Sequence, residues 1–89
     1  MNSILITYDL HNPDRNYPRI SEAIKALGDW CHPVESGWIV KTDLNELEVA
    51  NHLSNYIDSN DSLFTSELSK AVALLRIQGD CIDWLKSQL

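Results

Sequence analysis

The first segment of the chain is mostly apolar, and its residues fall on the two faces of a strand. In residues 3–9, Ile4 and Ile6 point to one side, and Leu5 and Asp9 point to the other. Six of the seven residues in "ILITYDL" suit a buried strand, and the seventh is Asp9. The pattern predicts a buried strand that ends on a carboxylate.

The next segment changes to helical spacing after a turn at residues 11–16, whose composition is typical of turns. Pro18 suits the first turn of a helix, because its missing N–H has no intrahelical partner there. Gly28 is a natural stop signal. The expected buried stripe of this helix consists of Ile20, Ala23, Ile24 and Leu27.

A hairpin follows. Residues 29–35 predict a short, irregular strand, because Pro33 interrupts its hydrogen bonding and favours an edge position or a bulge. Ser36 and Gly37 form the turn, and residues 38–42 predict the third strand.

A second helix begins at Thr42 or Asp43, since Asp43 followed by Glu46 is a capping-box pattern. Residues 58–61 end it, and residues 62–68 predict a fourth strand. The expected buried stripe of this helix consists of Leu47, Ala50, Leu53 and Ile57.

The element order is therefore βαββαβ, which predicts an α+β, ferredoxin-like two-layer sandwich. The 89 residues form one domain, with its core in residues 3–68 and a C-terminal extension in residues 69–89. Residues 69–77 suit either an extra strand or a packed extended segment. A short helix ends the extension, with Asp80 as its N-cap.

In such a fold the helices cover one face of the sheet, and the other face should alternate strictly if it meets water. Here Leu5 and Ile39 are apolar on that second face. We therefore expect the C-terminal extension or a second copy of the chain to cover it, and we predict a homodimer.

The net charge is −6, from 13 acidic and 7 basic residues, and the basic residues form no cluster. This disfavours nucleic-acid binding, which draws on Lys and Arg contacts to phosphate. No apolar run is long enough to span a membrane, so no membrane partner is expected. With the first strand starting almost at Met1, we expect no leader and a cytoplasmic location. Cys31 and Cys81, 50 residues apart, are expected to be free thiols there.

The amino-acid sequence of residues 3–68 resembles a known family, the SinR-like small proteins. Those proteins are in turn distantly similar to the small CRISPR-associated endonuclease of the Cas-two family. The resemblance rests on the strand end Tyr8-Asp9-Leu10, the Gly28 region, Ser36-Gly37-Trp38-Ile39-Val40 and the loop Asp58-Ser59-Asn60-Asp61.

The resemblance to the nuclease family implies a dimer in which Asp9 of each chain meets at the axis and binds Mg²⁺. Two carboxylates suffice for Mg²⁺, which keeps several of its waters and lowers the pKa of a bound one. Asp9 is then both the metal ligand and the catalytic residue. The chain departs from those relatives in lacking a basic cluster after this aspartate, where only Arg15 and Arg19 follow.

The same residues also allow other roles. Asp9 can instead cap the turn by accepting backbone N–H bonds from residues 10–12. Arg15, Arg19 and Ser36 are candidates for contact with phosphate or nucleic acid, and His11 for a general base. The tryptophans and tyrosines could stack bases on the sheet, although aromatic residues more commonly fill a small core.

Two functions compete. The favoured one is a non-catalytic protein-interaction or regulatory module, which binds a partner through a sheet edge or the C-terminal extension, in defence or mobile-element biology. The alternative is a Mg²⁺-dependent nuclease acting on RNA or DNA through paired Asp9. A third, a sheet-face binder of single-stranded nucleic acid or a nucleotide, fits the charge least.

Overall fold

The computed structural model describes residues 1–11, 13–69, 72–73, 75–77 and 81–88; for residues 13–17 and 88 it describes secondary structure alone. The elements, in chain order, are β1 (Asn2–Asp9), α1 (Pro13–Lys25), β2 (Asp29–Val34), β3 (Gly37–Thr42), α2 (Glu46–Leu53), a 3₁₀ turn η1 (Ser54–Tyr56), β4 (Ser62–Glu67) and α3 (Cys81–Gln88).

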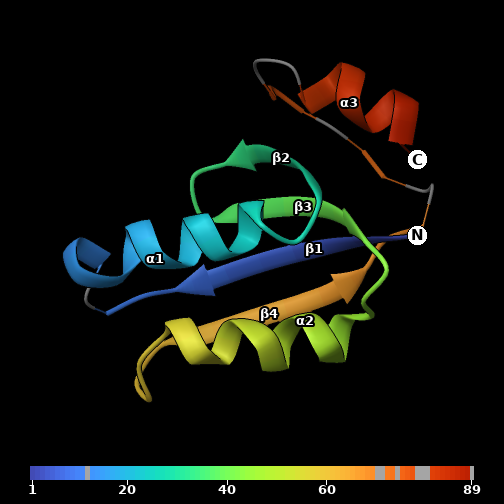
Figure 1. Cartoon of the computed structure of the whole chain (residues 1–89). Helices are drawn as coiled ribbons and strands as arrows, with labels where there is room; N and C mark the ends of the chain where they lie inside the picture. Colours follow the sequence, from blue (N-terminus) through green and yellow to red (C-terminus); the bar gives the residue numbers. More distant parts are fainter. Residues whose placement is uncertain (12, 70–71, 74, 78–80, 89) are drawn as a thin grey trace.

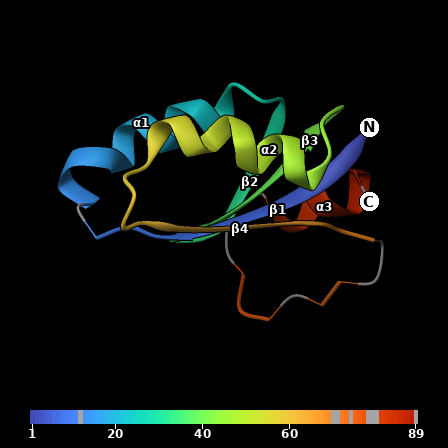
Figure 2. The ribbon, with the colours of Figure 1, turned by 90° about the horizontal axis from the view of Figure 1, so that it is seen from below.

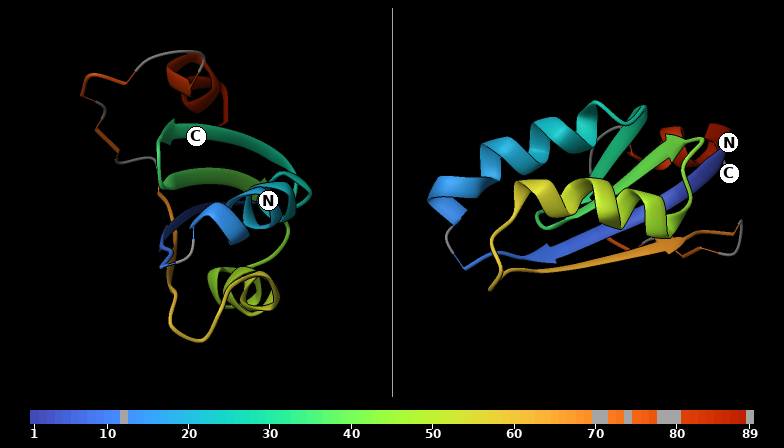
Figure 3. Two further views of the ribbon diagram at one scale, coloured as in Figure 1. Left: turned by 90° about the vertical axis from the view of Figure 1, so that its left-hand side faces the viewer. Right: turned by 60° about the horizontal axis from the view of Figure 1, so that its bottom comes forward.

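The four strands form one antiparallel sheet in the order β2-β3-β1-β4 (Figure 1). Helices α1 and α2 lie together on one face of the sheet (Figure 2). The described part of the C-terminal extension lies on the opposite side, and α3 packs beside β2 (Figure 3). The prediction of a two-layer α+β fold is confirmed at this level.

The core lies between the sheet and the two helices. Strands β1 and β3 supply its floor, since alternate side chains of both strands point towards α1 and α2. Trp38 Nε1 donates a hydrogen bond to the Tyr8 hydroxyl over 3.0 Å, so the polar atoms of this buried pair satisfy each other. The buried core residues are Ile4, Ile6, Tyr8, Ile20, Ala23, Ile24, Trp38, Val40, Val49 and Leu53.

Helix α1 begins earlier than predicted. Pro13, not Pro18, is its first residue, and Pro18 lies inside the helix. A proline inside a helix costs stability, because it removes one hydrogen bond and its ring crowds the carbonyl four residues earlier. The expected stripe is present: Ile20, Ala23 and Ile24 are buried. Burial of that stripe outweighs the local preference of Pro18 for a first turn.

Helix α2 has a different cap from the predicted one. Asn45, rather than Asp43, is the N-cap: its side chain accepts the Glu48 N–H over 2.8 Å, and Glu48 accepts the Asn45 N–H over 3.0 Å. The start therefore moves along the chain, and Val49 with Leu53 becomes the fully buried pair. Leu47, predicted to be buried, is 65% exposed.

Strand β2 is an irregular edge strand, as Pro33 predicted. Its pairing with β3 shifts register between Cys31 and Val34. Gly28, just before it, has a φ of +155°, and a Cβ there would collide with the Lys41 carbonyl oxygen. Gly28 therefore ends α1 and also lets the chain lie against β3.

The cysteines were predicted to be free thiols, and this was wrong: Cys31 of β2 and Cys81 of α3 form a disulfide. Their separation in the sequence gave no signal, because the tertiary fold alone brings α3 to β2. Residues 72–73 and 75–77 adopt no strand. The N-cap predicted at Asp80 lies outside the described residues. Within the described part of the chain, no helix is long and apolar enough to cross a membrane.

Candidate functional site

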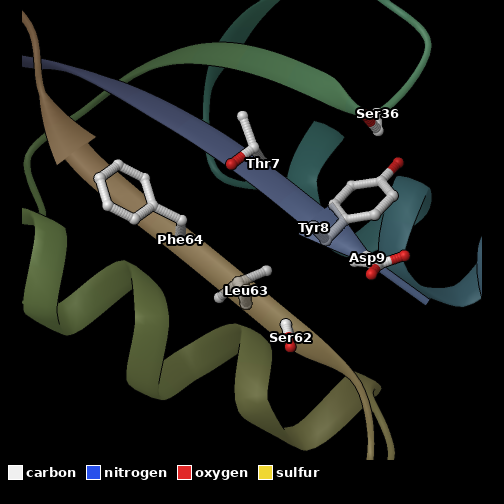
Figure 4. Close-up of a pocket in the computed structure, with 7 residues that line it drawn as sticks. All are labelled: Thr7, Tyr8, Asp9, Ser36, Ser62, Leu63 and Phe64. Carbon is white, nitrogen blue, oxygen red and sulfur yellow. The ribbon is translucent and has the colours of Figure 1, made fainter. Parts of the chain in front are cut away.

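The predicted site residue Asp9 ends β1 on the face of the sheet that α1 and α2 leave open. It pairs with Ser62 of β4, and Thr7 pairs with Phe64. Around these pairs lies a shallow, open depression of about 530 Å³ (Figure 4). Its lining residues are Thr7, Tyr8, Asp9, Ser36, Ser62, Leu63 and Phe64. Asp9 and Ser36, both predicted site residues, are therefore brought together.

The Asp9 side chain is exposed. Within the described residues, no hydrogen bond or ion pair engages its carboxylate. Within the described residues, Asp9 therefore does not cap the turn that follows β1. The carboxylate remains available to a ligand or a partner.

Asp61 does the capping instead. Its Oδ1 accepts the His11 N–H over 2.8 Å, across 50 positions in the sequence, and its Oδ2 accepts the Asp58 N–H over 2.8 Å. One carboxylate thus joins the exit of β1 to the entrance of β4, which sets the position of Asp9 relative to Ser62. The 58–61 loop was identified from the sequence, but its role as a tie between two strands was not.

Metal binding by one chain finds little support in these side chains. Among the described residues, no three His, Cys, Asp or Glu side chains come together to hold a metal ion. His11 is exposed near Asp9, but its recorded contact is the backbone bond to Asp61. A Mg²⁺ ion at Asp9 would therefore need a second copy of the chain to supply another carboxylate.

The basic residues predicted to contact phosphate do not gather at Asp9. The Arg19 guanidinium lies over the Tyr56 ring, 5.8 Å from its centroid, on the side of the sheet that the helices cover. The side chain of Arg15 lies outside the described residues. Lys41 is on the open face but at its far end, opposite Ser3 in the register and 3.4 Å from its hydroxyl.

Trp30 and Trp38 lie on the helix-covered side of the sheet and not on a base-stacking surface of the open face, and Trp84 is in α3. Trp38 is buried, with the His32 ring stacked on it at 3.8 Å and Trp30 tilted against it at 5.3 Å. Lys25 Nζ lies 5.1 Å from the centre of the Trp30 ring. These contacts fit the structural interpretation of the aromatic residues.

The aromatic residue on the open face is Phe64, which sequence reasoning did not single out. It is 62% exposed at the middle of β4. Leu5, half-buried, and Ile39, 6% exposed, lie on the same face in β1 and β3. The signal was the alternation in residues 62–68, where Phe64 falls on the same side as Thr7 and away from the core.

A second depression, of about 720 Å³, lies at the other end of the molecule, between the end of α1 and η1. His52 and Tyr56 line it together with Lys41 and two carboxylate residues, Asp29 and Asp43. Its charges are mixed and select no class of ligand. The Asp9 end therefore stays the candidate site.

No model of a known protein family matches this chain, and no solved structure matches it. The resemblance to the SinR-like and Cas-two families thus remains a prediction from the sequence. The open face of the sheet is therefore the basis of the proposed function.

Proposed function

We propose that this protein is a homodimeric, non-catalytic interaction module of the ferredoxin-like class, whose two copies pack open face against open face. The βαββαβ order and the central pairing of β1 with both β3 and β4 support the fold class. The observation that carries the proposal is Phe64, a large apolar side chain that is 62% exposed on this face, at the middle of the edge strand β4.

The apolar part of the face supports a protein partner. The exposed Phe64 and the half-buried Leu5 are contributed by two neighbouring strands, and polar Thr7 and Ser66 lie beside them. Exposed aromatic residues at the centre of a patch are the usual anchors of protein interfaces. The edge strand β4 has no Lys or Pro to discourage pairing with another strand.

The charges favour a second copy as that partner. On the open face Asp9 marks one end of β1, and Lys41, opposite Ser3, marks the other. A two-fold axis that lies between the two packed faces, perpendicular to β1, would place Asp9 of each copy over Lys41 of the other. Such self-complementary charge fixes the orientation of a symmetric interface. The net charge of −6 further disfavours nucleic acid as the partner.

The test is the oligomeric state of Phe64→Asp against a matched control, Leu47→Asp. Leu47 is similarly exposed, at 65%, but lies on α2. By light scattering at high micromolar concentration, the wild type and Leu47→Asp should have twice the mass of one chain, and Phe64→Asp should be a monomer. A monomeric wild type, or a Phe64→Asp variant that still dimerises, would refute the proposal.

The alternative of a Mg²⁺-dependent nuclease is favoured by one observation. The Asp9 carboxylate is exposed, engaged by no described residue, and lies beside Ser36 and Ser62 on the face that a dimer would bury. Two such carboxylates on a two-fold axis could anchor one ion, which would activate a water for attack on a phosphodiester.

Cleavage of RNA and DNA oligonucleotides with Mg²⁺ or Mn²⁺ tests this alternative, with Asp9→Asn compared against Asp43→Asn. Asp43 is exposed and remote from β4. Under the nuclease alternative, only Asp9→Asn abolishes the cleavage. Cleavage that both variants retain would remove Asp9 from the mechanism. If the wild type cleaves neither RNA nor DNA, the nuclease alternative is refuted and the interaction module is the function that remains.

The biological setting is proposed from the sequence alone. The SinR-like resemblance supports a role in defence or mobile-element biology, and the cytoplasmic location expected for the chain belongs to the same proposal. A partner other than a second copy would appear in the same mass measurement as a larger complex after incubation with lysate.

A further inference from the structure

The disulfide joins two parts of the chain that otherwise have few means of holding together. Cys31 is in edge strand β2, and Cys81 is the first residue of α3, 50 positions later. Helix α3 is the final element of the extension, and β2 is the element it packs against (Figure 1). The covalent bond therefore lies at the contact that docks the extension.

Few other contacts hold α3. Cys81 and Leu85 are its buried side chains, whereas Ile82 and Trp84 are half-buried. Within residues 81–87, Ser87 Oγ donates a hydrogen bond to the Trp84 carbonyl of the same helix, and no side-chain hydrogen bond of these residues reaches the described part of the sheet. An eight-residue helix is too short to be stable by itself in water.

The described residues of the segment that leads to α3 form no regular element that would anchor it. Residues 72–73 and 75–77 form neither strand nor helix, and Val72 and Leu75 are exposed. The docked extension covers part of the open face, where Cys31 and Ile39 pair across β2 and β3 and are buried. Among the described residues, what opposes the entropy of a free tail without the disulfide is the apolar contact of Leu85, with Ile82 and Trp84 half-buried.

We propose that the Cys31–Cys81 disulfide is a reversible redox latch: its reduction releases α3 from β2 and uncovers the apolar strip of Cys31 and Ile39. The reductant is a dithiol, whose first thiolate attacks one cysteine sulfur, breaks the Cys31–Cys81 bond and forms a mixed disulfide, while the other cysteine leaves as a thiolate and takes up a proton. The second thiol of the dithiol then displaces the attacked cysteine from the mixed disulfide. Two electrons and two protons pass from the dithiol to the two cysteines, and the dithiol becomes a disulfide.

Hydrogen exchange read by mass spectrometry tests the latch on the full chain, oxidised, reduced with dithiothreitol, and reoxidised with oxidised glutathione. On reduction, peptides from residues 81–88 should exchange about tenfold faster or more, while those from β1 and α2 keep their protection. Reoxidation should restore the slow exchange. Helix α3 packs beside β2, at the opposite edge of the sheet from Phe64 of β4, so the exchange of its peptides reports the latch separately from the proposed dimer.

The double variant Cys31→Ser/Cys81→Ser is the control. It should exchange like the reduced wild type, and dithiothreitol should change it no further. If the double variant does not fold, reduced wild type blocked with iodoacetamide replaces it. Equal protection of residues 81–88 in both redox states would overturn the proposal. So would loss of protection across β1 and α2 on reduction, because the disulfide would then stabilise the whole fold.

Discussion

Two aspartates at one end of the sheet have opposite environments. The Asp61 carboxylate accepts two backbone N–H bonds, each of 2.8 Å, and joins the ends of β1 and β4. The Asp9 carboxylate, one position before the loop it was expected to cap, is exposed and engaged by no described residue. Stability therefore rests on Asp61, and Asp9 is free of a structural task.

We expect Asp61→Ala to lower the free energy of unfolding by about 1–3 kcal/mol, because it leaves the His11 and Asp58 N–H groups without their acceptor. Asp9→Ala should change it by less than about 0.5 kcal/mol, as an exposed residue without partners. Urea denaturation followed by tryptophan fluorescence measures both. Equal losses in the two variants would contradict this division of roles.

At the scale of elements, the start of α2 shows how local signals compete. The sequence has two overlapping capping-box patterns, Asp43 with Glu46 and Asn45 with Glu48. Both satisfy the local rule equally well. Burial of Val49 and Leu53 against the sheet selects the second, because it sets which face of the helix meets the core.

Asn45→Ala should therefore cost about 1 kcal/mol of stability, the usual value for loss of an N-cap. Asp43→Ala should cost clearly less, since Asp43 is exposed and outside the observed box. Thermal unfolding followed by circular dichroism compares the two variants. A larger loss in Asp43→Ala would restore the cap predicted from the sequence.

The order and type of the elements of the core could be predicted, because they depend on short-range patterns. The period-two alternation found β1, and the Ile20–Ile24 stripe found α1. Boundaries were missed where packing overrides local preference, as at Pro18 and Asn45. In the candidate site, Asp9 and Ser36 were predicted to matter, but their closeness to Phe64 depends on the pairing of β1 with β4.

At the scale of the whole molecule, the two proposed functions require different dimers. If Asp9 of one copy lies over Lys41 of the other, the two Asp9 residues are separated by most of β1. Six residues of strand extend roughly 20 Å, whereas Mg²⁺ holds its ligands at about 2 Å. The charge-paired dimer therefore excludes a shared ion at Asp9, and a single interface geometry decides between the module and the nuclease.

The extension links the redox state of the protein to the size of its open face. Disulfides persist in oxidising compartments and are rare in the cytosol. If the expected cytoplasmic location is correct, the latch would be mostly open there, with Ile39 uncovered beside Leu5. An oxidising environment would close it and leave Phe64, on the edge strand β4, as the exposed apolar side chain of the face.

The amino-acid sequence by itself determined the succession of strands and helices and the two-layer class, since apolar spacing is a property of neighbouring residues. Only the tertiary structure decided the bond between Cys31 and Cys81, the tie made by Asp61 and the position of Phe64 beside Thr7. Each of these joins or separates residues that are far apart in the chain. Such distances are set when strands pair and helices pack, and no local pattern encodes them.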